Sequence, residues 1–227
     1  MEIVPGVHTI DSLGMGRAYL IIDADRVTIV DTGLKGSAEK VLRAVEAAGR
    51  KSQDVGQIVI THHHGDHVGS LADLVERTDA QVMVHALDAP IVRGDQPPPG
   101  PSSGGLLKPL LARMAVRAAV ARVDRELTDG DKIDALDGLQ VVHTPGHTPG
   151  SVSFYCPKRR LLFTGDAAAN LFGLRRPIGW FTEDMPRARE SIQKLAALDF
   201  EAAFFGHGRP MDREAALRFR RLAERLH

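Results

Sequence analysis

The chain of 227 residues has a single cysteine and no net charge. One cysteine excludes a disulfide within the chain, and Cys156 follows the apolar run 152–155, so we expect a buried strand residue rather than a nucleophile. Lysine plus arginine and aspartate plus glutamate number 29 each. This balance argues against a nucleic-acid partner, because phosphate binding normally leaves a basic footprint on the protein.

Long apolar segments are also missing. No run of about 18 apolar residues occurs, and residues 1–6 carry no basic cluster ahead of an apolar stretch. The sequence therefore predicts neither export nor membrane insertion, and a cytoplasmic location is expected. Hydrophobic residues make up 43% and charged residues 26%, as in ordinary globular proteins. The length suffices for one domain with a buried core.

Histidine is concentrated in one short segment. Residues 61–70 read THHHGDHVGS and directly follow the apolar run 57–60. Imidazole and carboxylate together suit zinc and its borderline neighbours. A strand that ends here can hold such a loop rigid at the edge of a sheet. The candidate metal ligands of this loop are His62, His64, Asp66 and His67.

Three further candidate ligands follow other strand-like segments. Each lies just after an apolar run and beside glycine or within a glycine-rich turn, where the backbone can turn and aim a side chain into a shared cleft. They are His147, Asp166 and His207. Three such placements, in addition to the histidine loop, make coincidence a poor explanation and predict a common metal site.

In this order the seven residues resemble the motif of the metallo-β-lactamase-fold metallohydrolase superfamily, in its glyoxalase II and lactonase-like branch. The resemblance covers nearly the whole chain and implies a four-layer αββα sandwich. It places His62, His64 and His147 on one metal, Asp66, His67 and His207 on a second, and Asp166 between both. It also implies that Asp31, in the segment 30–33 (VDTG), steadies the histidine loop from behind, as metal-bound imidazoles usually require.

Strand and helix patterns by themselves predict an α/β or α+β fold. We expect one domain over 1–227, with a helical insertion at about 93–121 that serves as a lid or as a core helix. The predicted strands are 18–22, 27–30, 57–60, 81–85, 140–143, 152–156, 161–163 and 202–205. The predicted helices are 37–48, 70–77, 106–120, 186–198 and 213–226.

The ligand set implies a hydrolase with two divalent metal ions about 3.5–4 Å apart and a bridging hydroxide as the nucleophile. Zinc is favoured, with iron or manganese as alternatives. Asp66 is expected to orient the nucleophile or to carry its proton. The expected substrate is a small-molecule ester, thioester or lactone, and the oligomeric state is left open.

Departures from the family pattern reduce the range of expected substrates. The commonest dizinc β-lactamases carry cysteine where this chain has Asp166, which disfavours a β-lactamase. Homoserine-lactone lactonases usually have tyrosine three residues later, where this chain has Ala169. The glutathione-binding extension of glyoxalase II lies beyond the last ligand, and only residues 208–227 follow here, so glutathione specificity is not expected.

Other function classes remain open. Persulfide dioxygenases of this superfamily keep the motif but use a single iron on the His62, His64 and His147 site. A phosphodiesterase and a non-catalytic metal-binding module are further alternatives.

Four other side chains carry separate expectations. We expect His63, between two ligands, to face outward with a structural role, and His85 to be a polar core residue. Trp180 and Phe181 serve either as pocket walls or in aromatic packing.

Overall fold

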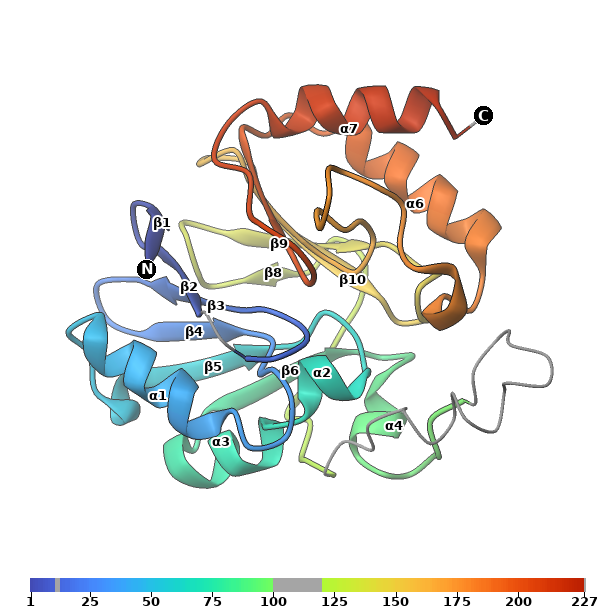
Figure 1. Ribbon diagram of the computed structural model, residues 1–227. Coiled ribbons are helices and arrows are strands. Elements are labelled where there is room, and N and C mark those ends of the chain that lie inside the picture. The colour runs from blue at the N-terminus through green and yellow to red at the C-terminus, as the bar shows by residue number, and fades with distance from the viewer. Residues whose placement is uncertain (11–12, 100–119, 227) are drawn as a thin grey trace. The chain divides into compact units, whose positions relative to one another are not determined.

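A computed structural model describes residues 1–10, 13–99 and 120–226 (Figure 1). The described residues form two compact units. The first contains Met1–Pro97 together with residues 120–127, and the second contains residues 98–99 and 128–226. Each unit is built around one β-sheet.

The sheet of the first unit has seven strands in the order in which they occur along the chain. They are β1 (Glu2–Val4), β2 (Val7–Ile10), β3 (Ala18–Ile22), β4 (Val27–Val30), β5 (Val55–Val59), β6 (Gln81–His85) and β7 (Arg125–Leu127). Strands β1 to β4 pair antiparallel, whereas β4 to β7 pair parallel. The carboxyl ends of β4, β5 and β6 therefore meet at one edge of the sheet, and the segments that follow them become neighbours.

Short helices connect these parallel strands. They are α1 (Ala38–Ala47), the 3-10 turn η1 (Ser52–Asp54), α2 (Gly65–Val68), α3 (Leu71–Thr78) and α4 (Ala89–Val92). Helices α1 and α3 lie on the same face of the sheet (Figure 1). Val41 and Val45 of α1 and Leu74 of α3 join Ile58 and Val82 of the sheet in one buried apolar cluster.

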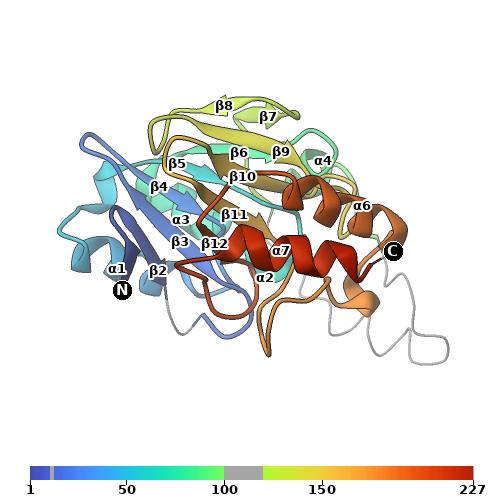
Figure 2. The same cartoon turned by 90° about the horizontal axis from the view of Figure 1, so that it is seen from above.

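The second unit has a five-stranded sheet in the order β12-β11-β10-β9-β8. Its elements are β8 (Lys132–Ile133), β9 (Leu139–His143), β10 (Val152–Cys156), β11 (Leu161–Gly165), the 3-10 turn η3 (Gly179–Phe181), α6 (Met185–Ala196), β12 (Ala202–Phe205) and α7 (Ala215–Glu224). Only β11 and β12 pair parallel. Helices α6 and α7 pack Ile192, Leu195 and Phe219 against Leu162 and Phe205 of the sheet (Figures 1 and 2).

The two mixed sheets with their helices confirm the predicted fold class. The strands predicted at 18–22, 27–30, 81–85, 152–156 and 202–205 have those bounds, and the other predicted elements that the structure describes differ by one or two residues at their ends. Strands β1, β2, β7 and β8, of two to four residues, were not predicted, because none of them is an unbroken run of apolar or β-branched residues like the equally short β4 and β12. The predicted helix at 106–120 lies outside the described residues, apart from residue 120. Among the described residues, no helix has the length and apolar character needed to cross a membrane.

Cys156 is the buried strand residue that the sequence predicts. Its side chain is 0% exposed and its thiol donates a hydrogen bond to the carbonyl of Leu136 at 3.0 Å. Burial raises the pKa of the Cys156 thiol above its ordinary value. The thiolate is therefore scarce near neutral pH.

We expect the native protein to resist thiol reagents for this reason. At pH 8, Ellman's reagent should label native Cys156 at least about a hundredfold more slowly than it labels the chain unfolded in guanidinium chloride. The unfolded chain serves as the control, because both samples contain the same single thiol. Equal rates in the two samples would show that Cys156 is accessible.

Candidate metal centre

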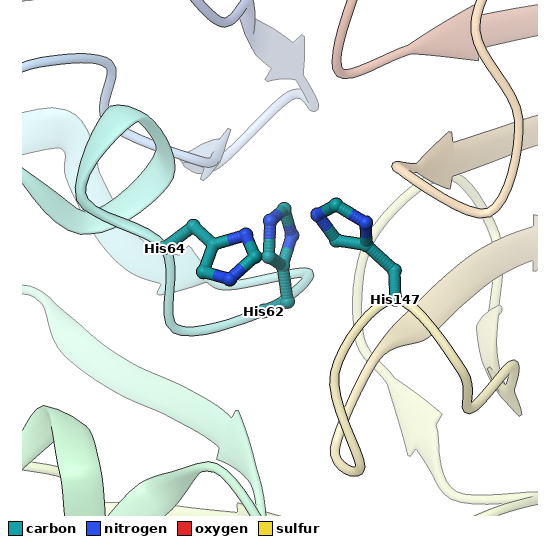
Figure 3. Close-up of side chains that lie close together, drawn as sticks. All are labelled: His62, His64 and His147. Carbon is teal, nitrogen blue, oxygen red and sulfur yellow. The ribbon is translucent and has the colours of Figure 1, made fainter. Parts of the chain in front are cut away.

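The histidine loop starts where β5 ends. After Val59 the chain leaves the sheet, and the loop leads into α2 at Gly65. The rings of His62 and His67 are buried and their centroids lie 4.0 Å apart, while the rings of His62 and His64 are separated by 4.8 Å. The His67 Nε2 and Asp66 Oδ2 atoms are 3.8 Å apart. The loop thus brings its four predicted ligands close together, as Figure 3 shows for the side chains of His62 and His64.

Asp31 fixes the base of this loop. It follows β4, the parallel neighbour of β5, and one of its carboxylate oxygens accepts a hydrogen bond from the Thr61 backbone N–H at 2.8 Å. The other oxygen accepts from the Thr61 hydroxyl at 2.7 Å and lies 2.8 Å from Nδ1 of His67. The supporting contact that the family resemblance implies for Asp31 is therefore present. A buried carboxylate in this position orients an imidazole ligand and sets its tautomer.

These contacts determine which ring nitrogens face a metal. A carboxylate only accepts hydrogen bonds, so His67 carries its proton on Nδ1 and presents the lone pair of Nε2. The Thr61 hydroxyl gives its one proton to Asp31 and lies 3.1 Å from Nδ1 of His62, from which it can accept. His62 then also presents Nε2. The Nε2 atoms of these two rings are thus the ones that could coordinate a metal ion.

His63 does not face outward, and that prediction is wrong. Its side chain is 1% exposed, and its Nδ1 lies 3.1 Å from Oδ2 of Asp88, which also accepts the His63 backbone N–H at 2.9 Å. Asp88 follows β6, the parallel neighbour of β5, and covers His63 at the same edge of the sheet. The prediction used only the position of His63 between two candidate ligands. It could not include Asp88, which comes from the segment after the neighbouring strand. The prediction for His85 is confirmed, since it is 5% exposed and its Nδ1 accepts the Leu87 N–H.

Replacing His63 with alanine is accordingly expected to lower the free energy of unfolding. The change leaves the buried Asp88 carboxylate without its imidazole partner, which costs about 1–3 kcal/mol. Urea unfolding monitored by circular dichroism measures this. His8→Ala is the matched control, because His8 is a partly exposed histidine of the same unit and its loss should cost less than about 0.5 kcal/mol. Equal midpoints for the two variants would contradict the role assigned to the pair.

The second unit assembles the other three predicted ligands. Asp166 follows β11 and His207 follows β12, and these parallel neighbours end at the same edge. His147 lies in the turn between β9 and β10. Oδ2 of Asp166 is 3.3 Å from Nε2 of His147 and 3.2 Å from Nε2 of His207. One carboxylate oxygen therefore lies between two imidazole rings.

The turn that carries His147 (Figure 3) is held by contacts that sequence patterns did not predict. Nδ1 of His147 lies 3.3 Å from the Thr182 hydroxyl, and the His147 carbonyl accepts the Glu183 N–H at 3.2 Å. Thr182 precedes helix α6, whose N-terminus is capped by the side chain of Asp184, which accepts the Arg187 N–H. No sequence pattern connects positions 147 and 182. The contact again leaves Nε2 of His147 for a metal.

The donor chemistry of both units fits divalent metal ions. Imidazole and carboxylate groups suit zinc, iron and manganese, and Cys156 is a buried residue of β10. Nδ1 of His62, His67 and His147 each lies beside an oxygen atom of Thr61, Asp31 and Thr182, respectively. Such outer contacts are the usual support of histidine ligands.

Comparison with known proteins identifies the family. Residues 11–207 match the model of the metallo-beta-lactamase superfamily. The chain belongs to this superfamily. A relative named "Probable metallo-hydrolase YflN" in Bacillus subtilis is 31% identical, over 92% of this chain and 86% of that protein. The hydroxyacylglutathione hydrolase of Cereibacter sphaeroides is 32% identical, over 84% of this chain but only 61% of that protein.

Solved structures agree with this superfamily fold. A metallo-beta-lactamase family protein of Thermus thermophilus superposes with a TM-score of 0.73 at 24% identity, over 99% of this chain and 79% of that one. The subclass B3 metallo-beta-lactamase BJP-1 of Bradyrhizobium japonicum gives a TM-score of 0.74 at 21% identity, over 100% and 89% of the two chains. Together with the relatives named as hydrolases, the superfamily match confirms the prediction of a metal-dependent hydrolase.

Proposed function

We propose that the protein hydrolyses an ester, thioester or lactone-type small molecule at a centre of two divalent metal ions, with zinc the favoured ion. The observation that carries this proposal is the position of Asp166, whose Oδ2 lies between Nε2 of His147 and Nε2 of His207. A carboxylate flanked by imidazoles is what a shared ligand of two cations requires. When bound, such a metal pair supplies a hydroxide nucleophile at neutral pH and polarises the scissile carbonyl.

The proposed ligand sets follow the family order. They are His62, His64 and His147 for one ion and Asp66, His67 and His207 for the other, with Asp166 shared. Within each unit, the ligands come from segments at the ends of strands, where β-sheet hydrogen bonds hold the backbone on one side. Asp31, Thr61 and Thr182 keep the imidazole rings oriented in the absence of substrate.

Asp66 has a second role in this proposal. Its side chain is 17% exposed, more than the adjacent His67 at 0%, so it is the acidic ligand of the loop that solvent can reach. A carboxylate in this position can accept a proton from the attacking water and pass it to the leaving group. We assign to Asp66 the orientation of the nucleophile and the transfer of its proton.

Metal analysis and a substrate panel test the proposal together. Protein purified without added metal should contain more than one zinc, iron or manganese ion per chain by mass spectrometry. A panel of lactones, thioesters, phosphodiesters and β-lactams should show turnover that a chelator abolishes and that added Zn²⁺ or Mn²⁺ restores. Folded protein with a stoichiometry near zero would contradict a metal centre. Oxygen uptake with a thiol persulfide and no hydrolysis would instead indicate the mononuclear iron dioxygenase.

A further inference from the structure

The loop between β11 and α6 exposes an unusual amount of apolar surface. We call residues 171–181 the apolar loop. Among the described residues, ten large apolar side chains are exposed, and five of them belong to this loop. They are Leu171 at 54%, Phe172 at 88%, Ile178 at 45%, Trp180 at 60% and Phe181 at 41%. Trp180 and Phe181 therefore do not take the core-packing role that is the commoner use of aromatic residues.

The apolar loop is attached at both ends to proposed metal ligands. At its start, Asn170 donates its backbone N–H to the carbonyl of His207 at 2.9 Å, and its side-chain amide donates to the Arg209 carbonyl at 2.7 Å. At its end, Thr182 and Glu183 contact His147. All these residues belong to the second unit. The exposed apolar side chains thus belong to a segment that begins and ends beside the proposed reaction centre.

The conformation of this loop is defined rather than irregular. Ala169 and Arg175 exchange two backbone hydrogen bonds, which close a hairpin with Phe172 near its tip. The Thr182 hydroxyl donates to the carbonyl of Ile178 and fixes the turn η3 that carries Trp180. Exposure of apolar side chains to water is unfavourable, and burying them in the core would lower the free energy of the folded protein. A loop with a fixed conformation that nevertheless keeps them exposed is typical of a binding surface.

We propose that the apolar loop binds the apolar acyl part of the substrate. This inference rests on the proposed hydrolysis of an ester, thioester or lactone. It adds that the acid part of the substrate is a medium-length fatty acid. The loop contains Arg175 and Arg176 and no acidic residue, so its charge complements the carboxylate of the fatty acid that hydrolysis releases. Substrates with a medium-length acyl chain should therefore be preferred over acetyl compounds.

Trp180 provides a direct test of binding, because it is the only tryptophan of the chain. Octanoate should shift the fluorescence of Trp180 to shorter wavelengths and protect it from quenching by iodide, whereas acetate should do neither. The double variant Phe172→Ser and Phe181→Ser should weaken octanoate binding by about tenfold, as expected for the loss of buried apolar area. Leu217→Ser is the matched control, because Leu217 is 42% exposed on α7 and lies outside the loop.

Kinetics with p-nitrophenyl octanoate and p-nitrophenyl acetate give the second readout. The double variant should raise KM for the octanoate ester by about tenfold and should change KM for the acetate ester much less. Octanoate that leaves the fluorescence unaltered would overturn the inference even if esters are hydrolysed. Dimers in light scattering that the double variant dissociates would overturn it too, since the loop would then be a contact between copies of the chain. Octanoate binding without hydrolysis of any substrate would refute the proposed function and leave the loop as an acyl-binding surface.

Discussion

Alanine in place of Asp166 is expected to reduce hydrolysis by at least about a hundredfold, the usual effect of losing one strong electrostatic element of an active site. The carboxylate is only 9% exposed and its Oδ2 contacts Nε2 of both His147 and His207. Without this anion, the repulsion between two cations is no longer screened, so the metal content should fall as well. Mass spectrometry of the metal and the initial rate on the best substrate of the panel measure the two effects.

Asp199→Ala is the matched control for this experiment. Asp199 is an exposed carboxylate of the same unit that pairs with Arg160 at 2.9 Å, and exposed pairs contribute little. Its loss should leave both metal content and rate near those of the unmodified protein. If Asp166→Ala retained full metal content and full activity, the proposed assignment of the ligands would be wrong.

The second large effect is expected from Gly69→Ala, which should destabilise the first unit by about 3 kcal/mol and distort the histidine loop. Gly69 follows α2 in ordinary helical conformation, so its backbone angles would accept alanine. The added methyl group, however, would overlap the backbone carbonyl oxygen of Gly65 and the backbone nitrogen of Lys35, and would lie 2.6 Å from the carbonyl carbon of Leu34. None of these atoms can rotate away as a side chain could.

The surrounding contacts leave no room for adjustment. The Ser70 hydroxyl donates to the Leu34 carbonyl at 2.6 Å, and the Thr32 hydroxyl and backbone N–H both donate to the His67 carbonyl. A displaced α2 would move Asp66 and His67 with it. We therefore expect weaker retention of metal in competition with a chelator, together with a lower unfolding midpoint.

Gly56→Ala is the control for Gly69→Ala. Gly56 lies in β5 of the same unit, where the nearest atom to an added methyl group would be the Cβ of Arg26 at 3.6 Å, an ordinary contact. This variant should unfold at or above the midpoint of the unmodified protein, because alanine reduces the entropy of the unfolded chain. A Gly69→Ala protein as stable as the Gly56→Ala protein would show that α2 can move without cost.

Much of the candidate site could be predicted from the sequence because its determinants are local. Imidazole and carboxylate groups that follow apolar runs identify the candidate ligands, and glycine or proline near them marks the end of a strand or a turn. His62, Asp166 and His207 each lie where the structure ends a strand or begins the segment after it. The same local periodicity predicted β6, β10 and β12 with their observed bounds. The family resemblance implied that Asp31 supports the histidine loop, and the structure adds that it does so through Thr61 and His67.

Tertiary structure alone decided the contacts between segments that are distant along the chain. His63 was expected to face outward, and only the parallel pairing of β5 with β6 shows that Asp88 covers it. The contact of Thr182 with His147 joins positions 35 residues apart that no local pattern relates. Whether an apolar side chain is buried likewise depends on what the rest of the fold places over it. For this reason the sequence alone determined the residues available for metal chemistry, whereas the fold determined their orientation and left the side chains of the apolar loop exposed.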